Sequence, residues 1–464
     1  MERIPWPVWR ISLVIVFGAF VGMLDSSLVN VGLDRIGTDL GATLDEVQWI
    51  STAYLIALAV SLPLCGWLSR KIGVGRLWLG AFAAFTVASG LCALAGNVEW
   101  LIVLRVVQGL AAGLLTPAGQ TVLGQAVGPQ RLGRVMSILG IAVSSAPAIG
   151  PTVGGVLLDS LSWQWLFLIN LPIGAVGVAL GLKYVPRGEP GTTGRLDWTG
   201  FALIGLGLPL FVYALSAVGE GSGGISPAVL ASLVLGAAGL VIFALRSWRR
   251  ERPLLDLTLF RNRVFTAGTV SSLFIGAAMF GAMLLFPLYF QILRGADVVT
   301  TGLSLLSLGL GTMVVLPLAG WLTDRHGGGI VAFAGGVGTV LVTVPFAFLG
   351  ADADPVLLQV LLFLRGMALA LSASPAGAAA FASVRREQLP DATTTLNILM
   401  RVGGAVAGAT IAVVLSRLLP TGAEHAFQVA FWWLIGASMA ALAAACWLWR
   451  VQRHERIQPV AVPA

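Results

Sequence analysis

The chain has 464 residues, of which 57% are hydrophobic and 11% are charged, and its formal net charge is +7. Soluble domains carry about 25% charged residues, so this composition excludes a soluble globular enzyme and a disordered chain. The basic residues are dispersed among hydrophobic segments, so the positive charge does not indicate nucleic-acid binding. The composition predicts an all-α membrane protein with many spans.

Fourteen segments are apolar over the roughly 20 residues that a bilayer span requires. Their approximate limits are 10–33, 47–68, 77–96, 100–124, 135–158, 164–182, 198–217, 227–245, 264–290, 301–322, 329–349, 355–383, 395–418 and 427–449.

The loops between these segments predict the orientation, because cytoplasmic loops are enriched in lysine and arginine. With the N-terminus placed in the cytoplasm, 22 of the 28 basic residues fall on the inner side. The outer loops hold Arg35, Arg294 and Arg417. We therefore expect a multi-pass protein of the inner (plasma) membrane with both termini cytoplasmic.

Four charged residues lie inside predicted spans, and Asp25 is the only acid among them; the others are Arg105, Arg365 and Arg401. A charge at the centre of a membrane helix costs at least about 2.5–3.5 kcal/mol, so such residues indicate function. The cysteines and histidines are scattered without ligand spacing, and no catalytic cluster is present, so we expect no metal, no cofactor and no enzymatic activity.

An internal repeat joins the two halves of the chain at offsets between 254 and 260 residues. The repeated pairs are Gly66–Ser69 with Gly320–Thr323, Arg105 with Arg365, and Thr116–Gly119 with Ser374–Gly377. Parallel repeats of six helices are a transporter architecture with the substrate cavity between the halves. We predict an N-terminal six-helix bundle at 1–189, a two-helix insertion with a cytoplasmic linker at 190–260, and a C-terminal six-helix bundle at 261–464.

Five motifs follow this architecture along the chain. They are Leu24–Val31, Gly66–Gly73, Leu104–Gly109, Gly150–Gly155 and Trp163–Gly174. Together they resemble the major facilitator superfamily, and more narrowly its 14-span drug:proton antiporter family. The resemblance implies a major-facilitator fold, two six-helix bundles plus two extra central transmembrane helices. It also implies export of hydrophobic, cationic or aromatic compounds by a monomer, with the proton gradient in place of a cofactor.

Asp25 and Arg105 are the predicted proton-coupling residues. A carboxyl that is wet in one conformation and dry in another can load and release a proton, whereas a permanently neutral Asp25 bonded within the bundle is the alternative. Arg105 keeps its charge and needs acceptors. The resemblance implies that it takes part in coupling, not necessarily through contact with Asp25; a structural arginine bound to carbonyls is the alternative. For Arg365, a structural role and a coupling role are both open. Arg401 either lines the cavity or binds a carbonyl.

The substrate pocket should be mostly apolar with few polar groups. The candidate residues are Asp25, Tyr54, Gln120, Phe286, Tyr289, Gln291, Asn397 and Arg401. The candidate gating residues are Gly66, Gly73, Gly150, Pro151, Gly154, Gly155, Asp324 and Arg325.

Two of the gating motifs carry specific expectations. The run Gly150–Gly155 resembles the antiporter motif, and we expect it to form a tight, pliable contact between the two halves rather than generic helix packing. The loop after the second span has Arg70 where the family has an aspartate, whereas the repeat copy keeps the acid as Asp324. Because Arg70 cannot accept the hydrogen bonds of that acid, we expect a weakened latch in the N-terminal half.

Other transport functions remain open at this point. A proton-coupled symporter for a nutrient would have more polar cavity residues and would lack the Gly150–Gly155 motif. An exporter of a single self-made antibiotic would carry the same motifs as a multidrug exporter of antibiotic resistance. The arginines at 246–252 are best interpreted as an anchor at the lipid headgroups of the bilayer.

The topology yields a first test in a chain whose three native cysteines are replaced. An Asp352→Cys variant should react with a membrane-impermeant thiol reagent added to intact cells, because its loop is predicted to lie outside. An Arg385→Cys variant should react only after the membrane is opened. The reverse labelling pattern would contradict the predicted orientation.

Overall fold

The computed structural model describes residues 4–191, 194–220, 226–250 and 253–457. Within these ranges the chain is helical, with no strand. The α-helices are α1 (Trp6–Leu40), α2 (Leu44–Ser61), α3 (Leu64–Ile72), α4 (Val74–Cys92), α5 (Val98–Val127), α6 (Leu132–Ser160), α7 (Trp165–Leu168), α8 (Asn170–Tyr184), α9 (Trp198–Glu220), α10 (Pro227–Arg249), α11 (Arg263–Leu288), α12 (Val298–His326), α13 (Gly328–Thr343), α14 (Pro355–Ala382), α15 (Leu389–Leu418) and α16 (Ala423–Ile457).

The described part of the chain has 13 helical segments long and apolar enough to cross a membrane, or 14 if α2 and α3 form one bent span. The predicted all-α membrane fold is thus confirmed. The segment predicted as one span at 47–68 bends by 57° between α2 and α3. Pro63 lies at this break, where its missing N–H and its ring interrupt the helix.

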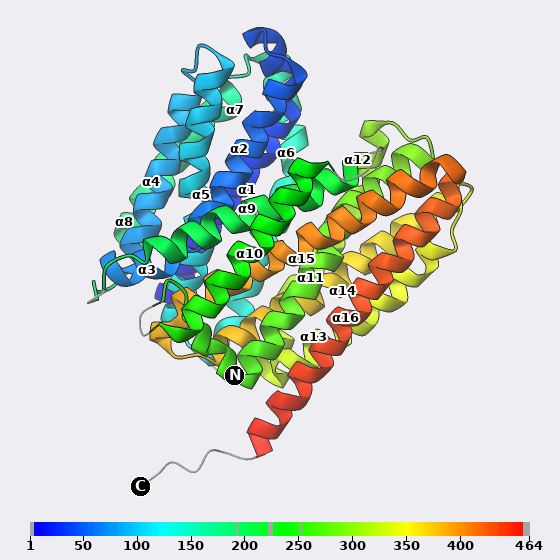
Figure 1. The fold of residues 1–464 in the computed structure, drawn as a ribbon. Coiled ribbons are helices and arrows are strands. Elements are labelled where there is room, and N and C mark those ends of the chain that lie inside the picture. The colour runs from blue at the N-terminus through cyan, green and yellow to red at the C-terminus, as the bar shows by residue number, and fades with distance from the viewer. Residues whose placement is uncertain (1–3, 192–193, 221–225, 251–252, 458–464) are drawn as a thin grey trace.

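The first six spans form one bundle (α1–α8), and the last six form a second (α11–α16) (Figure 1). The internal repeat is visible in how they pack. A Cβ on Gly109 of α5 would collide with the Tyr54 carbonyl oxygen of α2, and a Cβ on Gly366 of α14 would collide with the Leu308 carbonyl oxygen of α12. A glycine therefore brings the equivalent pair of helices together in each bundle, although it stands at a different distance from the arginine.

Helix α1 begins and helix α16 ends at the same end of the molecule, which we call the termini end (Figure 1). The bundles approach each other there and diverge toward the opposite end. Their contact, which we call the bundle seam, joins α3, α5 and α6 to α12, α14 and α15. In the seam Gly140 faces Leu316, and Ile141 packs beside Val315 and Leu316.

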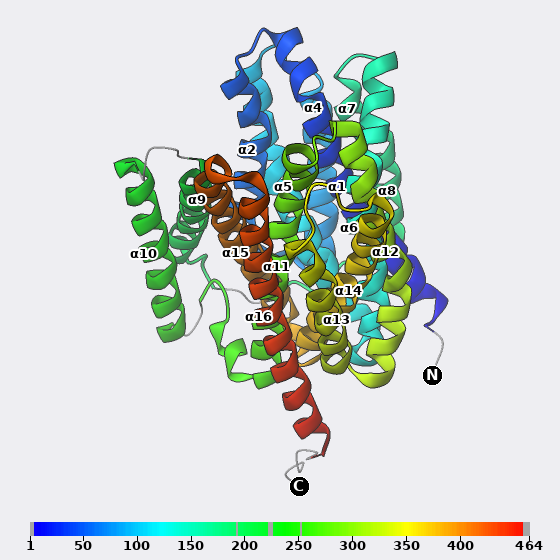
Figure 2. The same ribbon diagram turned by 90° about the vertical axis from the view of Figure 1, so that its right-hand side faces the viewer.

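The helices of the central insertion pack against each other, with α9 on the inner side and α10 at the periphery (Figure 2). Gly236 of α10 lies against the backbone of α9 at Phe211 and Gly207. α9 also contacts α15 of the second bundle and α2 of the first. The predicted boundary at 189/190 falls in the link between α8 and α9, and that at 260/261 falls within the short 3-10 helix η2 (Leu257–Arg261).

The arginines at the end of α10 have protein partners as well as a place near the membrane surface. Arg246 and Arg250 reach the Asp197 carboxylate at 3.3 and 3.0 Å, respectively. Asp197 directly precedes α9, so these ion pairs join the two insertion helices at one end. Lipid anchoring, the role predicted from the sequence, does not account for these two side chains by itself.

Candidate functional site

Asp25 lies at the centre of a hydrogen-bonded network inside the first bundle. Its carboxylate accepts hydrogen bonds from Arg105 Nη1 at 2.8 Å, Gln108 Nε2 at 2.9 Å and Asn170 Nδ2 at 2.7 Å. The donors come from α5 and from the first residue of α8, and the Asp25 side chain is fully buried. A buried carboxylate without partners would be very costly, and the three donors of this network offset that cost.

Arg105 has acceptors other than Asp25. Its Nη1 also donates to Gln108 Oε1 at 2.8 Å, and its Nε donates to the Ile50 carbonyl oxygen of α2 at 3.4 Å. The Tyr54 ring lies beneath the guanidinium, with the Arg105 Cζ 4.0 Å from the ring centroid. Arg105 thus connects the carboxyl on α1 to two residues of α2, and it does so by direct contact with Asp25, which sequence reasoning left open.

Three polar residues of this network were missed as candidates. Gln108 and Asn170 both lie in the motifs quoted above, and Ser89 accepts a hydrogen bond from Asn170 Nδ2 at 3.0 Å. All three side chains are fully buried. A buried polar group requires a hydrogen-bond partner. Polar residues within the predicted spans were therefore the sequence signal that could have identified these three residues. Gln108 is also three residues after Arg105, on the same face of α5.

A second set of polar residues lies across the bundle seam. Thr121 of α5 contacts Thr393 of α15, with 2.9 Å between their hydroxyl oxygens. One helical turn away from the termini end, Asn397 Nδ2 donates to Gln120 Oε1 at 2.7 Å. The structure therefore brings together Gln120 and Asn397, two of the predicted substrate-binding residues.

Arg401 continues this face of α15, four residues beyond Asn397. Its side chain is half-buried, and its positive charge lies within electrostatic range of the neutral Tyr54 phenol on α2 of the other bundle. Tyr54 is itself 2% exposed. Tyr54, Gln120, Asn397 and Arg401 thus form a group around the seam.

The other substrate candidates lie elsewhere in the structure. Phe286 and Tyr289 are enclosed in the core of the second bundle, where both rings contact Phe346 and Phe431. Gln291 is exposed in the short π-helical segment η3 (Tyr289–Leu293) that follows α11. These three residues are not grouped with the seam residues.

Arg365, the repeat equivalent of Arg105, has no acid beside it among the described residues. Its Nε donates to Thr343 Oγ1 at 3.1 Å and its Nη2 to the Ala278 carbonyl oxygen at 3.3 Å. The guanidinium also lies over the Phe286 ring, 5.1 Å from its centroid. These contacts suit a structural arginine.

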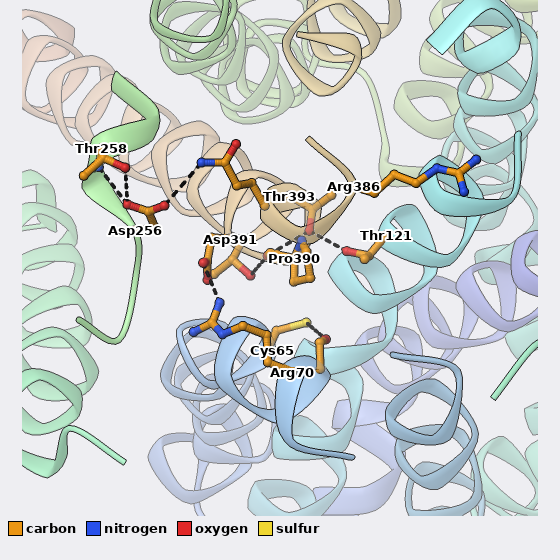
Figure 3. Close-up of polar contacts among 12 residues, drawn as sticks. Cys65, Arg70, Thr121, Asp256, Thr258, Arg386, Pro390, Asp391 and Thr393 are labelled. Carbon is orange, nitrogen blue, oxygen red and sulfur yellow. Dashed lines mark hydrogen bonds and ion pairs between the residues drawn. The ribbon is translucent and has the colours of Figure 1, made fainter. Parts of the chain in front are cut away.

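Two ion pairs close the bundle seam at the termini end, and we call them the latches. Arg70 Nη1 of α3 lies 2.5 Å from Asp391 Oδ2 of α15 (Figure 3). Arg134 Nε of α6 lies 2.6 Å from Asp324 Oδ2 of α12, and the Gly133 backbone N–H donates to Asp324 Oδ1 at 2.9 Å.

The two latches occupy equivalent places in the repeat with the charges exchanged. Arg70 and Asp324 are separated by the repeat offset of 254 residues, while Arg134 and Asp391 are each the third residue of their helix, α6 and α15. In both latches the acid lies at a helix N-terminus, where the helix dipole stabilises negative charge. Our expectation of a weakened N-terminal latch was therefore wrong, because α15 supplies the acid that α3 lacks.

The glycines of the repeated motif make room for this seam. A Cβ on Gly66 would collide with Asp391 Oδ1, and a Cβ on Gly320 would lie 2.7 Å from the Arg134 Cα. Gly73 and Gly327 end α3 and α12 with φ values of 91° and 94°, which favour glycine. Arg325 is not part of a latch; its guanidinium lies over the Trp321 ring at 5.1 Å.

The motif Gly150–Gly155 packs inside the first bundle. A Cβ on Gly150 would collide with the Ser27 side chain of α1, and one on Gly154 would touch Leu28 and Val31 of α1 at 3.4 Å. Pro151 is exposed, and a Cβ on Gly155 would meet open space. We predicted a contact between the two halves, and this was wrong: Gly150 and Gly154 face α1 and set the distance between α1 and α6.

Comparison with known proteins assigns the family. The profile of the Major Facilitator Superfamily matches residues 15–408. The chain belongs to this superfamily. It is a membrane transporter and not an enzyme.

Two relatives and two solved structures illustrate the likeness. The chain is 33% identical to the multidrug resistance protein B homolog of Mycobacterium tuberculosis (strain CDC 1551 / Oshkosh) over 89% of its own length and 77% of the relative. It is 30% identical to the putative multidrug resistance protein MdtD of Escherichia coli O6:K15:H31 (strain 536 / UPEC), over 95% of this chain and 93% of MdtD.

The crystal structure of the human organic anion transporter MFSD10 (TETRAN) superposes with a TM-score of 0.64 at 17% identity, covering 94% of this chain and all of that one. The proton:xylose symporter XylE bound to 6-bromo-6-deoxy-D-glucose gives 0.63 at 15% identity, with 96% and 95% covered. At these identities the two structures show the shared fold alone.

The latches predict how readily the bundle seam opens. Arg70→Asp places an acid beside Asp391, and loss of a charged hydrogen bond costs about 1.5–3 kcal/mol, so the seam should open more often. A Thr393→Cys reporter, now buried between α5 and α15, should then react faster with a water-soluble thiol reagent in inside-out vesicles.

The exchanged pair Arg70→Asp with Asp391→Arg is the decisive companion variant. It restores opposite charges, so the labelling rate should fall back toward that of the reporter alone, although a basic residue at the N-terminus of α15 keeps the recovery partial. If Arg70→Asp leaves the labelling rate unchanged, the ion pair does not hold the seam closed.

Proposed function

We propose that the chain is a proton-coupled antiporter that exports small hydrophobic compounds by alternating access. We place it in the inner (plasma) membrane, as a monomer with both termini cytoplasmic. The observation that carries the coupling proposal is the buried ion pair of Asp25 and Arg105, because Asp25 is the only acid predicted in mid-span. The names of the two relatives, multidrug resistance proteins, support export of drugs or antibiotics.

The ion pair suggests how a proton could change the conformation. Protonation of Asp25 turns a neutral pair into a neutral acid beside an unpaired guanidinium. Arg105 then depends on its remaining acceptors, which are Gln108 on its own helix, the Ile50 carbonyl oxygen and the Tyr54 ring. Two of these belong to α2, so protonation would strengthen the pull of Arg105 on that helix.

Tyr54 carries this change toward the seam. Its ring contacts Arg105 on one side, and its phenol is within the electrostatic influence of Arg401 on the other bundle. A proton on Asp25 would therefore be felt where the two bundles meet. The closed latches at the termini end fit an outward-facing state when that end is cytoplasmic.

The pocket expected from the sequence admits cationic or aromatic compounds. Asp25, the predicted partner of a cation, is engaged by three donors in this conformation. We therefore base the proposal on hydrophobic and aromatic character, which the apolar helices around the few polar residues of the seam support.

An Asp25→Asn variant tests the coupling. It removes the titrating group, so uphill transport driven by a pH gradient should be abolished. The measurement is accumulation of the neutral dye N-phenyl-1-naphthylamine in inside-out vesicles with an imposed proton gradient. The matched control is Asp34→Asn, which changes an exposed acid on the same helix and should pump near the wild-type rate.

Stability must be followed in the same preparations. Asp25→Asn leaves Arg105 buried without its counter-ion, which costs about 3–5 kcal/mol when a buried pair is broken. The double variant Asp25→Asn with Arg105→Gln should regain thermal stability and still fail to pump. Proton-driven accumulation by a folded double variant would contradict the assignment.

A further inference from the structure

Arg401 places a guanidinium inside a predicted span, and none of the residues that the structure describes is its counter-ion. Among the described residues it has no hydrogen bond or ion pair, in contrast to Arg105 and Arg365. An arginine does not lose its proton under physiological conditions, so its charge remains in the membrane. Arg401 is half-buried rather than enclosed, so part of the residue remains accessible.

The charges inside the spans are unbalanced toward the positive. Asp25 is committed to Arg105, Gln108 and Asn170. Arg365 and Arg401 therefore remain as two positive charges with no mid-span acid to neutralise them. Arg365 donates to a hydroxyl and a carbonyl and lies over an aromatic ring, although its Nη1 has no partner, whereas Arg401 has no hydrogen-bond acceptor at all among the described residues.

The position of Arg401 places this charge where the bundles separate. Thr393 and Asn397 on the same face of α15 contact α5 directly, and Arg401 follows one turn further from the termini end. A Cβ on Gly408, seven residues beyond Arg401, would meet open space. Gln120 and Asn397, which are hydrogen-bonded to each other, precede Arg401 along this face, and the Tyr54 phenol lies within its electrostatic range.

We propose that Arg401 binds an anionic group of the substrate, and that the exported compounds are hydrophobic organic anions of the carboxylate or sulfonate class. A guanidinium binds such groups through two parallel N–H donors, and the low dielectric strengthens the interaction. This inference rests on the proposed export function and gives the substrate the sign opposite to the cation expected from the sequence.

Anion export would also change the energetics of the exchange. A proton that enters carries one positive charge inward, and a monovalent anion that leaves has the same electrical effect. Each exchange therefore moves a net two positive charges inward. The membrane potential would then drive the cycle together with the pH gradient.

Binding of three compounds with the same ring tests the proposal: 1-naphthoate, neutral 1-naphthamide and 1-naphthylmethylammonium. Affinities are measured calorimetrically on the full chain in phosphatidylcholine nanodiscs at one pH without a gradient. The wild-type protein should bind 1-naphthoate about tenfold or more tightly than the amide, since one charged hydrogen bond corresponds to at least that ratio. The cation should bind weakest.

The variants assign the preference to one side chain. Arg401→Gln should bind the anion and the amide equally, and Arg401→Lys should keep part of the preference because it retains the charge without the planar fork. Arg417→Gln, which removes an exposed arginine near the end of the same helix, should behave as the wild type. Tightest binding of the cation by the wild-type protein, or an anion preference that survives in Arg401→Gln, would overturn the proposal.

Two further arms separate this proposal from others. Nanodiscs that contain phosphatidylglycerol should give the same naphthoate affinity as those of phosphatidylcholine. If the wild-type protein binds naphthoate more weakly in the anionic nanodiscs, and Arg401→Gln removes this difference, the guanidinium binds a lipid headgroup and the proposal is overturned. Binding is measured without a gradient, so an anion preference would still support this proposal if the Asp25 variants disproved proton coupling. Conversely, proton-driven flux of the neutral dye would still support proton coupling if the anion preference were absent.

Discussion

A guanidinium keeps its charge inside the membrane, and much of this site depends on how that charge is accommodated. Arg105 has a carboxylate on α1 and a carbonyl and a ring on α2, so it holds three parts of one bundle together. Arg365, at the equivalent place of the repeat, uses only neutral acceptors. One bundle thus pairs its central arginine with a carboxyl, whereas the other surrounds its arginine with neutral groups.

The seam shows a second use of charge. Each latch lies at a helix N-terminus, but the acid and the base come from different helices in the two latches. Both α6 and α15 begin at the seam with an acid nearby, which is supplied by α12 in one latch and by α15 itself in the other. A proline at position 390 leaves α15 without the N–H that Gly133 offers in α6. Asp391 belongs to α15 itself, so this latch does not need a backbone N–H donor at position 390. The acid and the base can therefore be exchanged between the two latches.

The sequence was sufficient for the spans, the repeat and the two charged residues of the network, because hydropathy and intramembrane charge act over short stretches of chain. It was insufficient wherever the answer depended on which helices face each other. Arg70 alone gave no sign of Asp391, which is 321 residues away. The glycines at 150 and 154 indicate close packing but not whether α1 or the other bundle is the neighbour, and the rings of Phe286 and Tyr289 fit a pocket and a core equally well by composition.

The insertion helix α9 has a consequence for the route that a lipid-soluble compound can take. It lies against α2 of one bundle and α15 of the other, so it covers one of the two sides along which the bundles meet. A compound dissolved in the bilayer would encounter α9 and α10 on that side. The opposite side, where α6 meets α12, carries no inserted helix. A lipid-soluble compound that approaches the seam from the bilayer would therefore meet inserted helices on one side and α6 and α12 themselves on the other.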